Sequence, residues 1–158
     1  MRPSLVATVE ELRRAAAEAK PGTRIRLAPG TYAGGIHLTG LSGAPGRPIV
    51  IASRDPAAPA VIEGGGSGLQ LTDAVHVELV GLSVRGQRGN GVNLDDGGTP
   101  ETPSHHVTLR GLTVRDVGVI ASGDGPLDDW QVAVLGNGGG DVVVMDNGPP
   151  AFQDTATL

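Results

Sequence analysis

Apolar and polar positions alternate in the same way in two segments of the chain that lie thirty residues apart. Residues 76–86 read HVELVGLSVRG and residues 106–116 read HVTLRGLTVRD, so seven of the eleven positions are identical. In both copies Val and Leu alternate with other residues, and a glycine, Gly81 or Gly111, interrupts the alternation at the same place. Alternation with a period of two predicts β-strands, because successive side chains of a strand point to opposite faces.

A repeat of this length predicts a stacked architecture. In such proteins each unit, here called a coil, buries its apolar residues only against the neighbouring coils. Short alternating segments bounded by Gly and Pro predict further strands around Ile25, Ile36, Ile49, Val61, Leu69 and Val92. The pattern therefore predicts an all-β solenoid built from short strands.

The first twenty residues predict a helix instead. Thr8 followed by Glu11 is a capping-box motif, which marks the start of a helix. The apolar residues that follow share one helical face and end before Pro21; they are Leu12, Ala15, Ala16 and Ala19. We expect residues 1–20 to form a capping helix, because an uncovered first coil would expose unpaired backbone groups.

Residues 21–117 carry the coil pattern, whereas residues 118–158 do not follow it. All twelve Lys and Arg residues lie at or before Arg115, and residues 116–158 contain seven aspartates and no basic residue. We expect residues 118–158 to be a divergent acidic tail. Disorder, a frame shift, a truncated gene or a divergent cap would each explain why the pattern breaks there. The last coil would then be open, and its free strand edges would favour self-association.

The composition excludes several classes of protein. Twenty-six glycines, twelve prolines and three aromatic residues indicate many tight turns around an aliphatic interior. The absence of cysteine excludes disulfide bonds and thiolate metal sites. The net charge of −5 and the scarcity of aromatics argue against nucleic-acid binding. We expect neither a membrane helix nor a signal peptide, because the chain has no apolar run of about 20 residues and its start shows no basic head followed by an apolar stretch.

Two arginines occupy equivalent positions of the repeat. If the coils stack in register, Arg85 and Arg115 lie one strand spacing apart, about 4.8 Å. Like charges at that distance repel each other unless an anion lies between them, and an acidic polysaccharide would supply carboxylates or sulfates for bidentate contacts. Alternatively Asp116 and solvent satisfy the pair, which is the interpretation we favour. Arg88 and Arg110 would enlarge the basic surface if they share its face.

Two adjacent carboxylates follow a predicted strand. Asp95 and Asp96 come directly after the segment Val92–Leu94 and offer the oxygen ligands that Ca²⁺ prefers. The same residues begin the sequence DDGGTPETP, which has the composition of a surface loop. We favour the turn over the calcium site.

Three histidines are candidates for acid–base catalysis, but two of them occupy the same position of the repeat. His76 and His106 are equivalent positions of the repeat, and His105 immediately precedes the second of them. A histidine can act as an acid or base near neutral pH. Because the position recurs, we favour a structural role at the start of the strand.

The order of these elements resembles a known architecture. After the helix come Gly22–Tyr32 (GTRIRLAPGTY), then Pro48–Ile51 (PIVI), then the two copies of the repeat. Together they resemble the N-terminal part of right-handed parallel β-helix proteins of the pectate-lyase-like superfamily, closest to the group of chondroitinase B and alginate lyases. The resemblance covers residues 7–117 and implies a right-handed parallel β-helix with an N-terminal capping helix.

The resemblance also implies a function. It suggests the N-terminal fragment of a secreted-type protein, extracellular or periplasmic, that acts on or binds an acidic polysaccharide. β-Elimination is the implied reaction of the complete protein, with Ca²⁺ neutralising the uronate carboxylate. The family's catalytic residues lie in middle coils, so we assign no catalytic residue and no cofactor to this chain. The alternative is a structural or adhesion scaffold without enzymatic activity.

Overall fold

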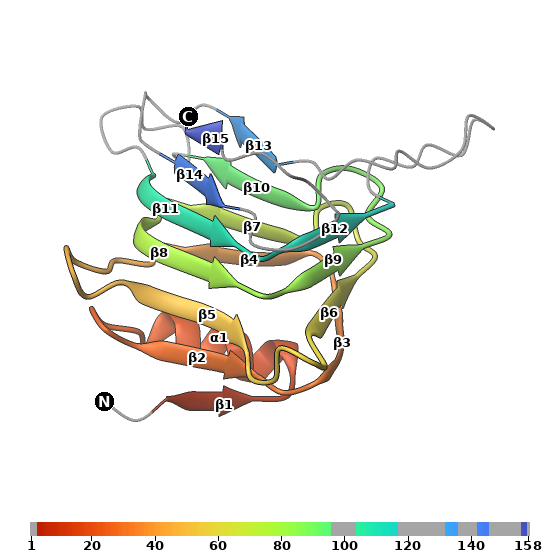
Figure 1. The fold of residues 1–158 in the computed structure, drawn as a ribbon, viewed down its shortest axis with the longest axis horizontal. Coiled ribbons are helices and arrows are strands. Elements are labelled where there is room, and N and C mark those ends of the chain that lie inside the picture. Colours follow the sequence, from red (N-terminus) through yellow and green to blue (C-terminus); the bar gives the residue numbers. More distant parts are fainter. Residues whose placement is uncertain (1–2, 96–103, 117–131, 136–141, 146–155, 158) are drawn as a thin grey trace.

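The chain folds mostly into parallel β-sheets with one short helix. The computed structural model describes residues 3–95, 104–116, 132–135, 142–145 and 156–157. Its strands form three sheets (Figure 1). Sheet A contains, in spatial order, β1 (Ser4–Val6), β2 (Arg24–Leu27), β5 (Ile49–Ser53), β8 (Val75–Val80), β11 (His105–Arg110), β14 (Val142–Met145) and β15 (Ala156–Thr157).

The other two sheets contain four strands each. Sheet B consists of β3 (Gly30–Ala33), β6 (Ala60–Glu63), β9 (Ser83–Arg85) and β12 (Thr113–Arg115). Sheet C consists of β4 (Ile36–Thr39), β7 (Leu69–Thr72), β10 (Val92–Asp95) and β13 (Val132–Leu135). From β2 to β14 the described strands visit sheets A, B and C in turn, and each adds a parallel strand to its sheet. Strand β15 departs from this order, because it pairs with β14 in antiparallel fashion. The strands predicted from the alternating segments are confirmed.

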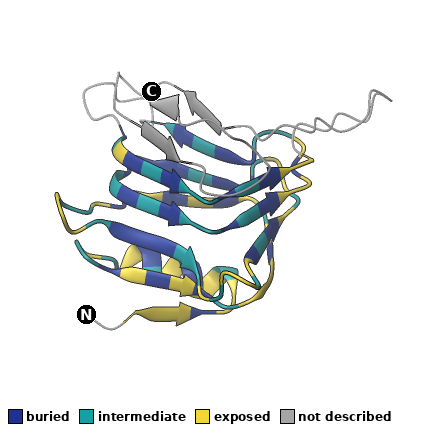
Figure 2. Cartoon of the chain, in the orientation of Figure 1, coloured by how far each residue is buried: buried dark blue, intermediate teal, exposed yellow. Residues whose placement is uncertain are grey.

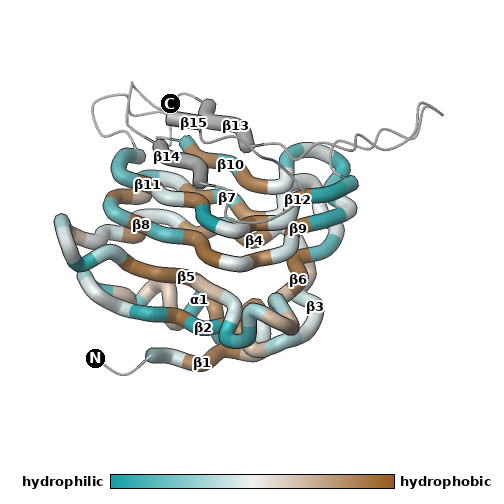
Figure 3. The backbone as a smooth tube through the Cα atoms, in the orientation of Figure 1, coloured by the Kyte–Doolittle hydropathy of each residue, from teal (hydrophilic) through white to brown (hydrophobic). Residues whose placement is uncertain are grey.

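The alternating apolar residues point inward and stack in columns. Ile25, Ile51, Leu79 and Leu109 occupy one position of four neighbouring strands of sheet A, and each is at most 1% exposed. Figure 2 shows buried residues along the strands of successive passes. Figure 3 shows that apolar positions recur within the strands, whereas hydrophilic positions gather at the turns. Aliphatic burial of this kind is the main favourable term in folding.

The glycine shared by the two repeat copies has a backbone role. Gly81 lies between β8 and β9 with φ of 65°, and Gly111 lies between β11 and β12 with φ of 60°. A residue with a Cβ atom is strained in this left-handed region, whereas glycine is not. The two glycines therefore allow the chain to turn from sheet A into sheet B at the same point of each pass.

The N-terminal region combines a strand with a short helix. Helix α1 (Val9–Ala17) begins as predicted, because the Thr8 Oγ1 atom accepts a hydrogen bond from the Glu11 N–H at 3.1 Å. Leu12 and Ala16 are buried, and the helix contacts β1, β2 and β4. The helix ends two residues before Ala19. The assignment of residues 1–20 to a helical unit missed β1, which precedes the helix and pairs in parallel with β2.

Much of the predicted loop and tail lies outside the described residues. Residues 96–103 of the predicted loop lie outside the described residues. Ser104, which follows them, is buried and forms hydrogen bonds with residues of two neighbouring segments. The Ser104 Oγ atom donates to the Asp95 carbonyl at 2.8 Å and accepts from the Ala74 N–H at 2.9 Å. Of residues 118–158 only three strands are described, and β13 and β14 pair in parallel with β10 and β11. Within the described residues, no helix has the length and apolarity needed to cross a bilayer.

Candidate functional site

The register of sheet B places two arginines side by side. Arg85 ends β9, Arg115 ends β12, and their Cα atoms are direct partners across the strand pair. Both residues are exposed. Neighbouring strands lie about 4.8 Å apart, so the two side chains leave the sheet about one strand spacing from each other.

A carboxylate beside this pair was not identified from the sequence. Glu63 ends β6 and is the Cα partner of Arg85, on the side opposite Arg115. Its Oε2 atom lies 3.6 Å from the Arg85 Nη2 atom, and the two side chains are about half exposed, at 48% and 50%. Among the described residues, Arg85 thus forms an ion pair with Glu63, whereas the sequence suggested Asp116.

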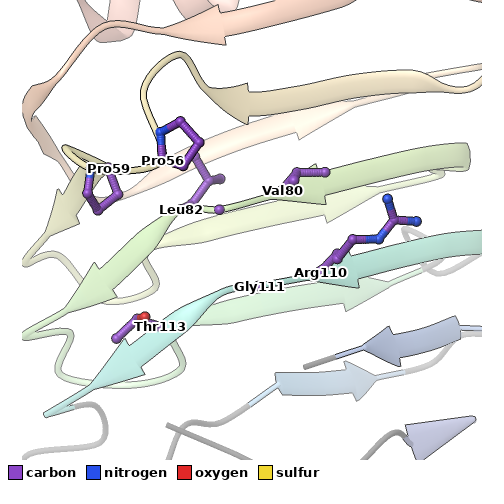
Figure 4. A pocket seen from close by; sticks show the side chains of 8 residues that line it. Pro56, Pro59, Val80, Leu82, Arg110, Gly111 and Thr113 are labelled. Atoms are coloured by element: carbon purple, nitrogen blue, oxygen red, sulfur yellow. The ribbon is translucent and has the colours of Figure 1, made fainter. Parts of the chain in front are cut away.

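The other two arginines lie apart from each other. Arg88 is exposed in the turn after β9, where its N–H donates to the Gly65 carbonyl at 3.0 Å. Arg110 ends β11 in sheet A and lines a groove of about 340 Å³. Figure 4 shows this groove, with prolines of the loop between β5 and β6 on one side and Arg110 on the other. Its lining residues are Pro56, Pro59, Val80, Gly81, Leu82, Arg110, Gly111 and Thr113.

Polar side chains on sheet C form hydrogen bonds with one another. The Asp95 Oδ2 atom accepts from the Gln70 Nε2 atom at 2.8 Å, and Asn93 Nδ2 donates to Ser67 Oγ at 3.1 Å. Asp96, the second residue of the predicted calcium pair, lies outside the described residues. Asp95 is thus placed at the end of β10, where its carboxylate binds an amide of the neighbouring strand.

Three histidines meet on the outer side of sheet A. The His76 and His106 rings stack with centroids 4.4 Å apart, and the His105 and His106 Nδ1 atoms are 2.9 Å apart. Partial burial, and then the charges of His106 and His105, lower the pKa of His76 below its ordinary value. The repeat indicated that His76 and His106 are equivalent, but it did not indicate that His105 joins them.

Comparison with known proteins places the chain by its fold. No family model matches the sequence, and neither does any curated protein. The structure is similar to that of an alginate lyase from Paenibacillus sp. str. FPU-7, with a TM-score of 0.57 and 24% sequence identity. The two share a fold. The match covers 95% of this chain but 59% of the lyase chain, so this chain spans less than two thirds of that structure's length.

Proposed function

We propose that this chain is the N-terminal part of a right-handed parallel β-helix protein of the secreted type that binds an acidic polysaccharide. The order in which the chain visits the three sheets supports a helical winding. The fold similarity to an alginate lyase supports a relationship with polysaccharide-active proteins. The observation that carries the proposal is the adjacent, exposed pair Arg85 and Arg115.

The charges around the pair favour an external anion. Two guanidinium groups one strand spacing apart repel each other, and Glu63 supplies one carboxylate, on the Arg85 side. A uronate carboxylate or a sulfate between the two arginines would offset the remaining charge through bidentate hydrogen bonds. Because all three side chains are exposed, each contact contributes little by itself, and the affinity would come from several units of a polymer.

The groove beside Arg110 offers a second contact for the same ligand. Its walls include Pro56, Pro59 and Val80, which are apolar and at least partly exposed, and Arg110 provides a cation at its side. Sugar rings present both apolar faces and polar edges, so a mixed lining of this kind suits them. Arg110 would bind a carboxylate while the ring rests on the apolar residues.

The residues of this chain support binding better than turnover. β-Elimination requires a base that removes a proton next to the uronate carboxylate. The single tyrosine, Tyr32, is buried, its hydroxyl donates to the Ala28 carbonyl at 2.8 Å, and burial followed by the Glu11 charge raises its pKa. The single lysine, Lys20, follows the helix on another part of the molecule. The three clustered histidines lie on sheet A, whereas the arginine pair lies on sheet B. We therefore propose binding for this chain and β-elimination for the complete protein.

Retention on immobilised alginate or heparin tests the binding proposal. The parent chain should be retained at low salt, and Arg85→Ala/Arg115→Ala should elute earlier. The matched control is Arg24→Ala/Arg26→Ala, which removes two exposed arginines from β2 and leaves the net charge equal to that of the first variant. Equal losses in the two variants would attribute retention to overall charge, and an unretained parent would also contradict the proposal.

The Glu63–Arg85 ion pair favours a second candidate, a structural or adhesion scaffold. In that case Arg85 is satisfied within the protein and needs no ligand. Two measurements together distinguish the candidates. One is retention on the immobilised polymer, and the other is the release of unsaturated products from uronate polymers incubated with the chain, with and without Ca²⁺. Turnover would exclude a scaffold, whereas a chain that shows neither retention nor turnover would support one.

A further inference from the structure

We propose that His76, His105 and His106 form a binding site for a divalent transition-metal cation, of which Zn²⁺ is the member we name. The site lies on sheet A, whereas Arg85 and Arg115 lie on sheet B. It is thus independent of the proposed polysaccharide binding.

The distances suit coordination after small side-chain movements. Each histidine offers one ring nitrogen, and the three atoms lie within 4.8 Å of one another. Nitrogen ligands of a tetrahedral zinc, at Zn–N distances near 2.0–2.1 Å, are about 3.3 Å apart. The 2.9 Å between the Nδ1 atoms of His105 and His106 is slightly shorter than this value, and the 4.8 Å limit is longer. Metal binding would therefore require rotations about the side-chain bonds, which adjust these distances and turn the stacked rings of His76 and His106 toward one ion.

The repeat explains two of the histidines but not the third. His76 and His106 have φ of 49° and 53°, in the left-handed region that His, Asn and Asp tolerate better than most residues. Backbone geometry is thus sufficient reason for a histidine at this recurring position. His105, however, is the Cα partner of Val75, so β11 carries an imidazole where β8 carries an aliphatic side chain.

The ligand chemistry selects the class of metal. Neutral imidazoles prefer Zn²⁺, Ni²⁺, Cu²⁺ and related ions, whereas Ca²⁺ and Mg²⁺ prefer oxygen. The chain has no cysteine and four histidines, all within the described residues. The fourth, His37, lies on sheet C and its Nε2 atom is 2.7 Å from the Thr72 Oγ1 atom. Coordination by more than one imidazole therefore depends on the cluster of His76, His105 and His106.

The surroundings leave room beside the metal. His76 and His106 line a pocket of about 250 Å³ together with Glu78 and Thr108. Three nitrogen ligands with one open position resemble the coordination of zinc ions that also bind water or a further ligand. The carboxylate of Glu78 and the hydroxyl of Thr108 can accept hydrogen bonds from such a water.

Calorimetric titration of the metal-free full chain with Zn²⁺ tests the proposal, and Co²⁺ provides a second readout through its visible absorption. We expect one metal ion per chain and no competition from Ca²⁺ or Mg²⁺. His105→Val introduces the residue found at the equivalent position of the first repeat copy. His106→Asn keeps a residue type that tolerates the left-handed backbone. His37→Asn, outside the cluster, is the matched control.

Each cluster variant should weaken Zn²⁺ binding at least about tenfold, while the control binds like the parent. Thermal unfolding in the presence of a chelator should be similar for parent and His105→Val, which shows that the loss does not arise from misfolding. His105→Val decides the test by itself if His106→Asn does not fold. The proposal is overturned by a parent that does not bind, by an equal loss in His37→Asn, or by one metal ion per two chains with dimers in sedimentation.

Discussion

A single residue, Glu63, reduces the positive charge that Arg85 offers to a ligand. The two side chains form an exposed ion pair of 3.6 Å, and Arg115 lies on the other side of Arg85. The sequence indicated the arginine pair through the repeat, since Arg85 and Arg115 are thirty residues apart. It did not indicate Glu63, because that residue is twenty-two residues before Arg85 and lies in a pass of different length.

Removing the charge of Glu63 should strengthen polysaccharide binding. In Glu63→Gln the carboxylate of the polysaccharide no longer competes with the carboxylate of Glu63 for Arg85. Exposed ion pairs contribute about 0.2–1 kcal/mol, so we expect affinity for alginate oligomers to rise by about 1.4- to 5-fold. Calorimetric or fluorescence titration measures the change. Glu10→Gln, which removes an exposed charge from the helix, should raise affinity less, and an equal rise would show that only net charge matters.

At the scale of the strands, the sequence identified which segments form strands better than it indicated how far apart successive strands of one sheet lie. The alternation of Val, Ile and Leu identified most strands correctly, because one face of each is buried. The column Ile25, Ile51, Leu79 and Leu109 has spacings of 26, 28 and 30 residues. Because the turns differ in length, the earlier passes do not show the thirty-residue spacing of the two repeat copies, and the sequence comparison did not detect them. Strand β1 was missed because it is three residues long and exposed at two of them.

Truncating one member of this column should destabilise the fold. Leu79 is fully buried between Ile51 and Leu109, so Leu79→Ala leaves a cavity that parallel strands on both sides cannot easily close. Such substitutions cost about 2–5 kcal/mol of unfolding free energy, which urea denaturation measures. The control is the same substitution at Leu5, which is 54% exposed and should change stability by well under 1 kcal/mol. Similar losses at both positions would contradict the inward packing of the column.

At the scale of the molecule, each sheet presents different chemistry on its outer side. Sheet A carries the histidine cluster, sheet B the arginine pair, and sheet C hydrogen-bonded amides and hydroxyls. The sequence could place repeat-equivalent residues such as Arg85 and Arg115 together, because stacking converts a sequence period into proximity. It could not place Arg110 relative to them, since that depends on where the chain turns from sheet A into sheet B at Gly111.

The most direct test of the account is whether residues 85 and 115 are neighbours in solution. The chain contains no cysteine, so Arg85→Cys/Arg115→Cys carries only the two introduced thiols. Their Cα atoms would be about 4.8 Å apart, within the 4.4–6.8 Å range of disulfide bonds. In the control, Glu63→Cys/Arg115→Cys, the positions are two strands apart at about 9.6 Å, beyond that range.

Mild oxidation followed by mass spectrometry of the monomer measures the cross-link. In-register stacking predicts an intramolecular disulfide in Arg85→Cys/Arg115→Cys and free thiols in the control. No disulfide in the first variant, or equal cross-linking in both, would contradict the register that brings Arg85 and Arg115 together, and the proposed anion-binding surface with it.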